Sequence, residues 1–144
     1  VIAKLKATAA VAALVGQRVY PRLAPQSALN RADGTTAFDS YIVVRRPSGE
    51  DRTRRLARRD TFRKTPLVIY CMADDHLKAC RVADAVMEAL DPTTTDVTGS
   101  QTWGSYSVDH CEVVDSYDAS TDPQLADEIG FPIEAIDINL FHNC

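Results

Sequence analysis

One stretch of the sequence has residue types suited to binding an anionic partner. Nine of the twenty residues from Arg45 to Lys64 are basic, and only Glu50, Asp51 and Asp60 are acidic. The basic residues are Arg45, Arg46, Arg52, Arg54, Arg55, Arg58, Arg59, Arg63 and Lys64. This stretch, the basic segment, therefore carries a formal charge of +6. Because the whole chain carries -4, the other 124 residues carry -10.

The composition of the basic segment favours a binding role over a solvated surface. Like charges held close together raise the energy of the folded chain unless an opposite charge meets them. Eight of the nine basic residues are Arg, and the planar guanidinium group forms paired hydrogen bonds with carboxylates and phosphates. A surface that serves solubility alone would be expected to use Lys too. The expected partner is nucleic acid or the acidic remainder of another copy of the chain.

A second group of residues has the types of a metal site without a complete ligand set. His76 and Cys80 are four residues apart in a predicted helix and share a face, and Asp74 and Asp75 lie nearby. Spacing supplies no further ligand, and Cys80 falls on the predicted apolar stripe of the helix. We therefore expect ordinary polar residues at a helix N-terminus, Cys80 in the core, and no metal.

Catalytic motifs are also missing from the sequence. All six glycines are isolated, so there is no glycine-rich phosphate loop, and there is no Gly-x-Ser-x-Gly motif. His110 and Cys111 are neighbours in a predicted strand and must point to opposite faces, so they cannot form a nucleophile–base pair. A hydrolase built near Asp74–His76 would lack a complete set of nucleophile, base and orienting group. We expect no catalytic residue and no cofactor.

Carboxylates are dense towards the end of the chain but do not follow the twelve-residue pattern of a calcium loop. This acidic set comprises Asp115, Asp118, Asp122, Asp127 and Glu128. We interpret it as a solvated acidic face or as a partner for arginines.

The overall composition is that of a single globular domain spanning residues 1–144. A chain of 144 residues with 45% hydrophobic and 25% charged residues has enough apolar surface for one core. No apolar run approaches the ~20 residues that span a bilayer, so no membrane partner is expected. Lys4 and Lys6 interrupt the apolar N-terminus, which we interpret as a helix and not a signal peptide. The scattered cysteines fit a reducing compartment, with Cys71 and Cys80 buried.

The elements that would position these residues follow from the periodicity. The predicted helices are Ile2–Leu14 and His76–Leu90, and the predicted strands are Phe38–Arg46, Pro66–Ala73, His110–Tyr117 and Ile133–Phe141. The run Pro66–Ala73 is continuously apolar, which favours a strand covered on both faces. We interpret the basic segment as a long hairpin arm or loop, and residues 93–107 as a polar loop. The expected fold is α+β, with one mainly antiparallel sheet and two helices on one face.

Several strings of this sequence resemble the tail-terminator (tail-completion, minor tail protein U-like) family of tailed bacteriophages. The resemblance begins in the Ala-rich helix and is most specific at Gly16–Pro21 and Ala24–Gln26. It continues through the strand Pro66–Met72 and the helix His76–Leu90, and ends with the alternating strand near Phe141. The long loop Asp91–Ser107 and the arginine density of the basic segment depart from the family pattern.

The resemblance implies a structural virion protein at the head-proximal end of the tail, assembled in the host cytoplasm. Members of the family form hexameric rings that cap the tail tube, stop its polymerisation and present a surface to the head connector. Genome DNA passes through the ring without sequence-specific binding. The basic segment would then contact a neighbouring subunit or the tail tube protein. The alternative from the residues alone is a small nucleic-acid-binding module that uses the same segment.

Overall fold

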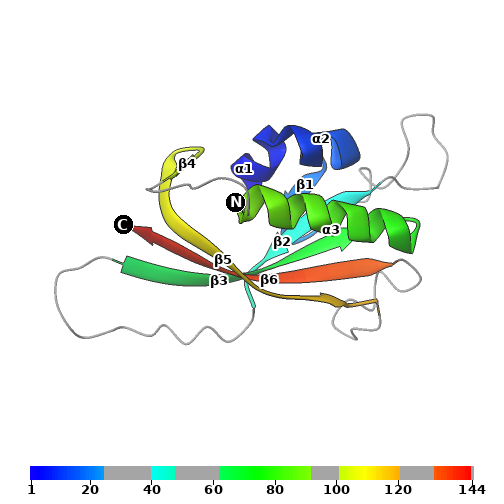
Figure 1. The fold of residues 1–144 in the computed structure, drawn as a ribbon. Helices are drawn as coiled ribbons and strands as arrows, with labels where there is room; N and C mark the ends of the chain where they lie inside the picture. Colours follow the sequence, from blue (N-terminus) through cyan, green and yellow to red (C-terminus); the bar gives the residue numbers. More distant parts are fainter. Residues whose placement is uncertain (25–39, 48–61, 92–100, 121–131, 144) are drawn as a thin grey trace.

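The computed structural model describes residues 1–24, 40–47, 62–91, 101–120 and 132–143. Within them the chain forms one curled sheet with helices packed against it (Figure 1). Among the described helices, none combines the length and apolarity needed to cross a bilayer. The prediction of an α+β fold is confirmed.

Among the described residues, the sheet has six strands and is antiparallel except at one edge. In spatial order they are β1 (Val19–Pro21), β2 (Tyr41–Arg45), β3 (Phe62–Met72), β6 (Ile133–Asn143), β5 (Tyr106–Asp118) and β4 (Gln101–Trp103). β1 pairs with β2 in parallel, and the other neighbours pair antiparallel. The prediction of one mainly antiparallel sheet is therefore confirmed, although we expected four strands and the sheet has six.

The N-terminal helix is broken where a single helix was expected. It consists of α1 (Ile2–Ala7) and α2 (Ala9–Val15), separated at Thr8, which has extended backbone angles. The Thr8 hydroxyl donates a hydrogen bond of 2.9 Å to the carbonyl oxygen of Lys4. Such side-chain bonds to the preceding turn compete with the regular helix pattern and can bend or interrupt it. The prediction of one continuous helix was wrong at this residue.

The third helix, α3 (His76–Leu90), has the predicted bounds. It packs against β3, β5 and β6, and also against α1 and α2. Its buried residues are Ala79, Val82, Ala83, Val86, Ala89 and Leu90. Figure 1 shows α3 running across the sheet, with α1 and α2 farther out on the same side. The apolar stripe of this helix is thus the part of the core that joins the helices to the sheet.

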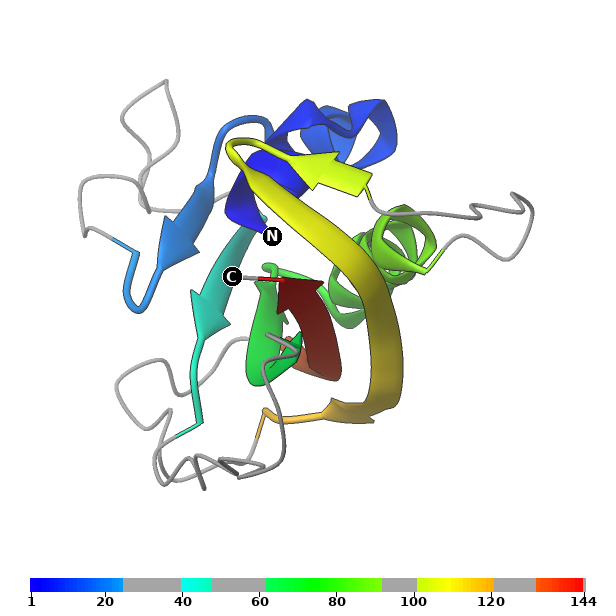
Figure 2. The ribbon, with the colours of Figure 1, turned by 90° about the vertical axis from the view of Figure 1, so that its left-hand side faces the viewer.

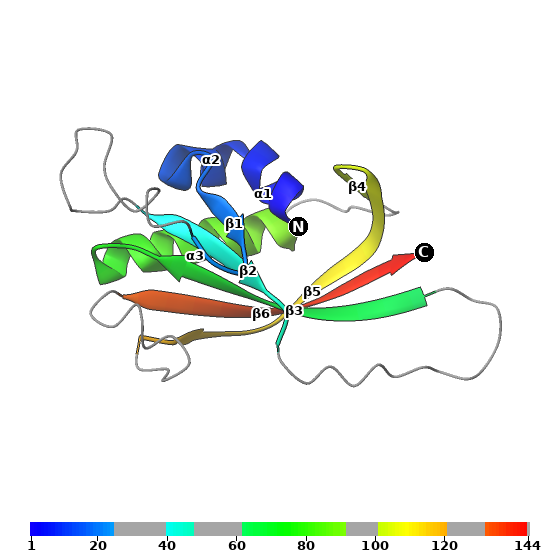
Figure 3. The ribbon, with the colours of Figure 1, turned by 180° about the vertical axis from the view of Figure 1, so that it is seen from behind.

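Both faces of the central strands are buried. Ile69 and Cys71 belong to the larger core cluster beneath the helices, whereas Tyr70 and Met72 belong to a smaller cluster. Since successive side chains of a strand point to opposite faces, the smaller cluster lies on the other side of the sheet. Figure 3 shows the ribbon from behind. This arrangement confirms that the run within Pro66–Ala73 is covered on both faces.

β3 continues well beyond the end of β2. β2 pairs with β3 only as far as Val68, while β6 pairs with β3 back to Phe62. Pro66 lies in this extension. Proline has no backbone N–H to donate, but no described strand pairs with β3 at Pro66 on the side where β2 lies, so no hydrogen bond of the sheet is lost there. β3 therefore begins inside the basic segment, four residues earlier than expected.

A hairpin occupies the end of the region predicted to be a polar loop. β4 and the start of β5 are joined by a turn at Gly104, which has a positive φ of 68°. Trp103 is buried, and the strong curvature of β5 brings this hairpin toward α1 (Figure 2). Gly104 lies close to α1: a Cβ atom added at Gly104 would be only 3.1 Å from the Cβ of Ala3.

Candidate functional site

The N-terminal end of the basic segment is held against the folded domain. Arg45, the last residue of β2, donates a hydrogen bond of 2.6 Å from Nε to the carbonyl oxygen of Arg22. Its guanidinium carbon lies 5.5 Å from the centroid of the Tyr70 ring, a distance at which a cation is attracted to the ring face. The side chain of Arg45 therefore lies against its own chain, and the following Arg46 is exposed.

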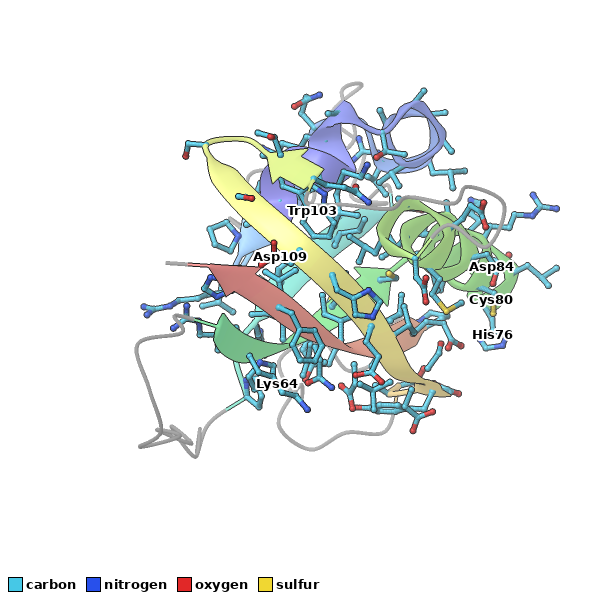
Figure 4. All side chains as sticks on the ribbon, turned by 60° about the vertical axis from the view of Figure 1, so that its left-hand side comes forward. Lys64, His76, Cys80, Asp84, Trp103 and Asp109 are labelled. Carbon is cyan, nitrogen blue, oxygen red and sulfur yellow. The ribbon has the colours of Figure 1, made fainter. Side chains whose placement is uncertain are left out.

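The C-terminal end of the basic segment lies in the part of β3 that extends beyond β2. Lys64 is exposed, and its Nζ lies 5.8 Å from the centroid of the Phe141 ring on β6. Arg63 is paired with His142 in the β3–β6 ladder. Figure 4 shows Lys64 near the start of β3, far from α3. Five predicted contact residues lie outside the described residues: Arg52, Arg54, Arg55, Arg58 and Arg59.

An acidic surface with an open strand edge lies on β5. From His110 onward, β5 pairs only with β6 among the described strands, so its other edge has no described partner. Glu112, Asp115 and Asp118 are exposed on this part of β5, next to the exposed side chain of Val114. We call residues 110–118 the acidic edge. It includes two residues of the acidic set, Asp115 and Asp118; the set's other three residues lie outside the described part of the chain.

A cluster of potential metal ligands joins α3 to β6. Cys80 Sγ lies 3.6 Å from His76 Nε2 and 3.6 Å from Glu134 Oε1, and His76 Nδ1 lies 3.8 Å from the same carboxylate oxygen. The fold thus adds Glu134 to the two residues that share a helix face. Cys80 is half-buried at this surface, so the expectation of a core cysteine was wrong.

The other residues considered for chemistry take structural roles. Asp74 accepts an ion-pair hydrogen bond of 2.8 Å from Lys78, one turn further along α3. Cys111 is buried and His110 is exposed, stacked on Phe141 with ring centroids 5.8 Å apart. This placement on opposite faces agrees with the prediction that His110 and Cys111 do not cooperate.

The described part of the chain is thus a small α+β domain with an acidic strand edge on β5. A model of the family described as tail completion protein gp17 matches residues 1–122. Because the match covers most of the chain, the protein belongs to the tail completion protein gp17 family, and it is a structural protein of the phage tail.

One solved structure has the same fold. The chain is similar to a chain in the virion of a native gene transfer agent (GTA) particle, with a TM-score of 0.63 and 18% sequence identity. The similarity covers 98% of this chain and 90% of that chain. At this identity the likeness establishes the shared fold. No curated protein matches the sequence significantly.

Proposed function

We propose that the protein forms a closed ring of six subunits at the head-proximal end of the phage tail. In this role it caps the tail tube, ends tube polymerisation and presents a surface to the head-completion or connector protein. Genome DNA would pass through the ring channel without sequence-specific contacts. The observation that carries the proposal is family membership over residues 1–122, combined with the segregation of charge along the chain.

The charge distribution supports a contact between unlike surfaces. The basic segment carries +6 and the rest of the chain -10, and the acidic edge places three exposed carboxylates beside a strand edge without a described partner. A head-to-tail contact joins two different surfaces of one subunit, and it generates a ring when the rotation between subunits closes. The basic segment of one subunit would meet the acidic edge of the next subunit or an acidic face of the tail tube.

The described contacts indicate which residues of the basic segment are available for such an interface. Arg45 is bound to Arg22 and Tyr70 of its own chain, so its role is to fix the point where the segment leaves the sheet. Arg46 and Lys64 are exposed at the two ends. We propose that the arginines between these ends make the intersubunit contact, with Arg46 and Lys64 at its border.

The assembly state of the purified protein tests the proposal. Analytical ultracentrifugation and negative-stain imaging, alone and with tail tubes, should reveal rings, at least when tube is present. Tubes grown without the protein should exceed the normal length, since nothing would stop polymerisation. A strict monomer that never associates with tails would contradict the proposal.

Binding to short DNA duplexes separates this function from the alternative, a nucleic-acid-binding module. Phosphate contacts made by arginines release counterions, so affinity would fall steeply with salt. A protein that forms no ring but binds duplexes in this way would support the alternative.

A further inference from the structure

Three side chains of types that bind transition metals converge on the surface between α3 and β6. His76 and Cys80 come from successive turns of α3, and Glu134 comes from the start of β6 (Figure 4 labels the two helix residues). One donor atom from each residue lies within 4.8 Å of the others. We propose that His76, Cys80 and Glu134 bind a zinc ion that links helix α3 to the sheet.

Two of the three separations between donor atoms match those of a zinc site. Zinc bonds of about 2.0–2.3 Å in a tetrahedral arrangement place neighbouring donor atoms about 3.3–3.6 Å apart. Cys80 Sγ lies 3.6 Å from both His76 Nε2 and Glu134 Oε1. The third separation, between His76 and Glu134, is wider, because the 3.8 Å contact is made by Nδ1 and not by Nε2, and the donor atoms lie within 4.8 Å of one another. Rotation of the His76 ring would bring one donor atom of each residue into bonding range of one ion.

The chemistry of the three donors selects the metal. Magnesium and calcium prefer oxygen ligands, whereas a thiolate combined with an imidazole suits zinc and related transition metals. Cys, His and Glu side chains each bind zinc, and three protein ligands with an open fourth position are the arrangement of many zinc sites. The fourth position would be filled by water, since the side chain of His76 is 58% exposed while that of Glu134 is 12% exposed.

The electrostatic surroundings favour a cation at this place. The carboxylates of Glu134 and Asp84 lie near the Cys80 thiol. Asp118, opposite Glu134 in the β5–β6 ladder, is a further carboxylate at this place. A divalent ion would satisfy these negative groups and replace the thiol proton, so zinc binding would release protons into solution.

The fold holds the three ligands in place independently of any ion. His76 and Cys80 lie four residues apart on a helix whose apolar stripe is anchored in the core. Glu134 is paired with Cys71 of β3 on one side and with Asp118 of β5 on the other. The backbone of each ligand thus belongs to a regular element, which limits the reorganisation needed on binding.

Titration of the full chain with Co²⁺ tests the proposal, because cobalt replaces zinc and its thiolate bond absorbs in the near ultraviolet. The titration would use the Cys144→Ser variant so that the terminal thiol cannot contribute. We expect one ion per chain, the thiolate–cobalt absorption, displacement of cobalt by zinc, and a melting temperature raised by zinc. Absence of the absorption, or no effect of zinc on melting, would overturn the assignment.

Single substitutions then identify the ligands. Cys80→Ser should abolish the thiolate–cobalt absorption. His76→Gln and Glu134→Gln should each weaken cobalt binding at least about tenfold, because loss of a residue that only supports a metal ligand already lowers metal affinity by about that factor. His110→Gln and Glu112→Gln provide matched controls on β5 and should bind as the parent does. If the ligand variants bind cobalt as tightly as these controls, the three residues are not the site. None of these measurements depends on ring formation.

Discussion

Asp137 of β6 lies directly opposite Asp115 of β5, at a register shift between the two strands. Asp137 Oδ1 is buried and has no hydrogen-bond partner among the described residues. Desolvation, together with the charge of Asp115, raises the pKa of Asp137. Two carboxylates that face each other across a strand pair are destabilising when both are ionised.

We therefore expect Asp137→Asn to increase the stability of the protein at neutral pH. The gain should be about 0.2–1 kcal/mol, the usual range for a cross-strand charge pair. The folded state of the parent binds more protons than the unfolded state between the ordinary Asp pKa and the raised one. The parent should therefore become relatively more stable as the pH falls through this window, and the advantage of the variant should shrink. Urea unfolding from neutral pH down to about pH 4 measures both effects.

Asp115→Asn is the companion variant for this prediction. It removes the like charge but leaves the desolvated Asp137 carboxylate, so a smaller gain is expected. A variant of Asp137 that is less stable than the parent at neutral pH would contradict the account.

The contacts of Arg45 predict a stability effect that is separate from assembly. Arg45→Ala removes the hydrogen bond to the Arg22 carbonyl and the contact with the Tyr70 ring. The expected cost is about 1–2 kcal/mol in the free energy of unfolding. Arg46→Ala, one residue further on and exposed, removes the same charge and should change stability little. Equal effects of the two substitutions would show that charge, and not these contacts, is responsible.

Charge reversal in the basic segment tests the proposed subunit contact. In the double variant Arg54→Glu/Arg55→Glu, we expect the protein to remain folded but to lose ring assembly, measured by sedimentation velocity. Adding Glu112→Arg/Asp115→Arg on the acidic edge should restore part of the assembly if the two surfaces meet. Reversal in an unrelated acidic position, Glu88→Arg on α3, is the control and should not rescue. Rings that persist unchanged in the first variant would exclude this role for the segment.

Gly104 provides a prediction for the β4–β5 hairpin. Its φ of 68° favours glycine, and an added Cβ would lie 3.1 Å from the Cβ of Ala3 on α1. Gly104→Ala should therefore cost about 1–2 kcal/mol from the backbone conformation alone, and more if α1 cannot move. Ser105→Ala in the same turn is the control, with little change expected. Thermal unfolding followed by circular dichroism measures both variants, and an unchanged melting temperature for Gly104→Ala would contradict the geometry.

The elements with strong periodicity were predictable from the sequence. Helix α3 has the predicted bounds because its apolar stripe is regular and Asp91-Pro92 ends it. The apolar run Pro66–Ala73 was identified correctly as a strand covered on both faces. The short strand Val19–Pro21 was not predicted, because three residues carry no usable period.

Other features depend on contacts between distant residues. The β4–β5 hairpin was missed because its turn, Gly104-Ser105, lacks the Asn-Gly or Asp-Gly pair that marks many two-residue turns. Glu134 was missed as a neighbour of Cys80 because the two residues are 54 positions apart, and only the strand register brings them together. The acidic residues of β5 were recognised as an acidic face, but their position along a strand edge could not be inferred from composition.

The burial of two core cysteines determines how the protein responds to oxidants once the phage particle has left the host. Burial places Cys71 and Cys111 in apolar surroundings, and desolvation raises the pKa of Cys71 and raises the pKa of Cys111 to about 12. Oxidants attack the thiolate form, which is almost absent at either sulfur in the folded protein. These thiols should therefore remain reduced in aerated surroundings, without glutathione or thioredoxin to protect them.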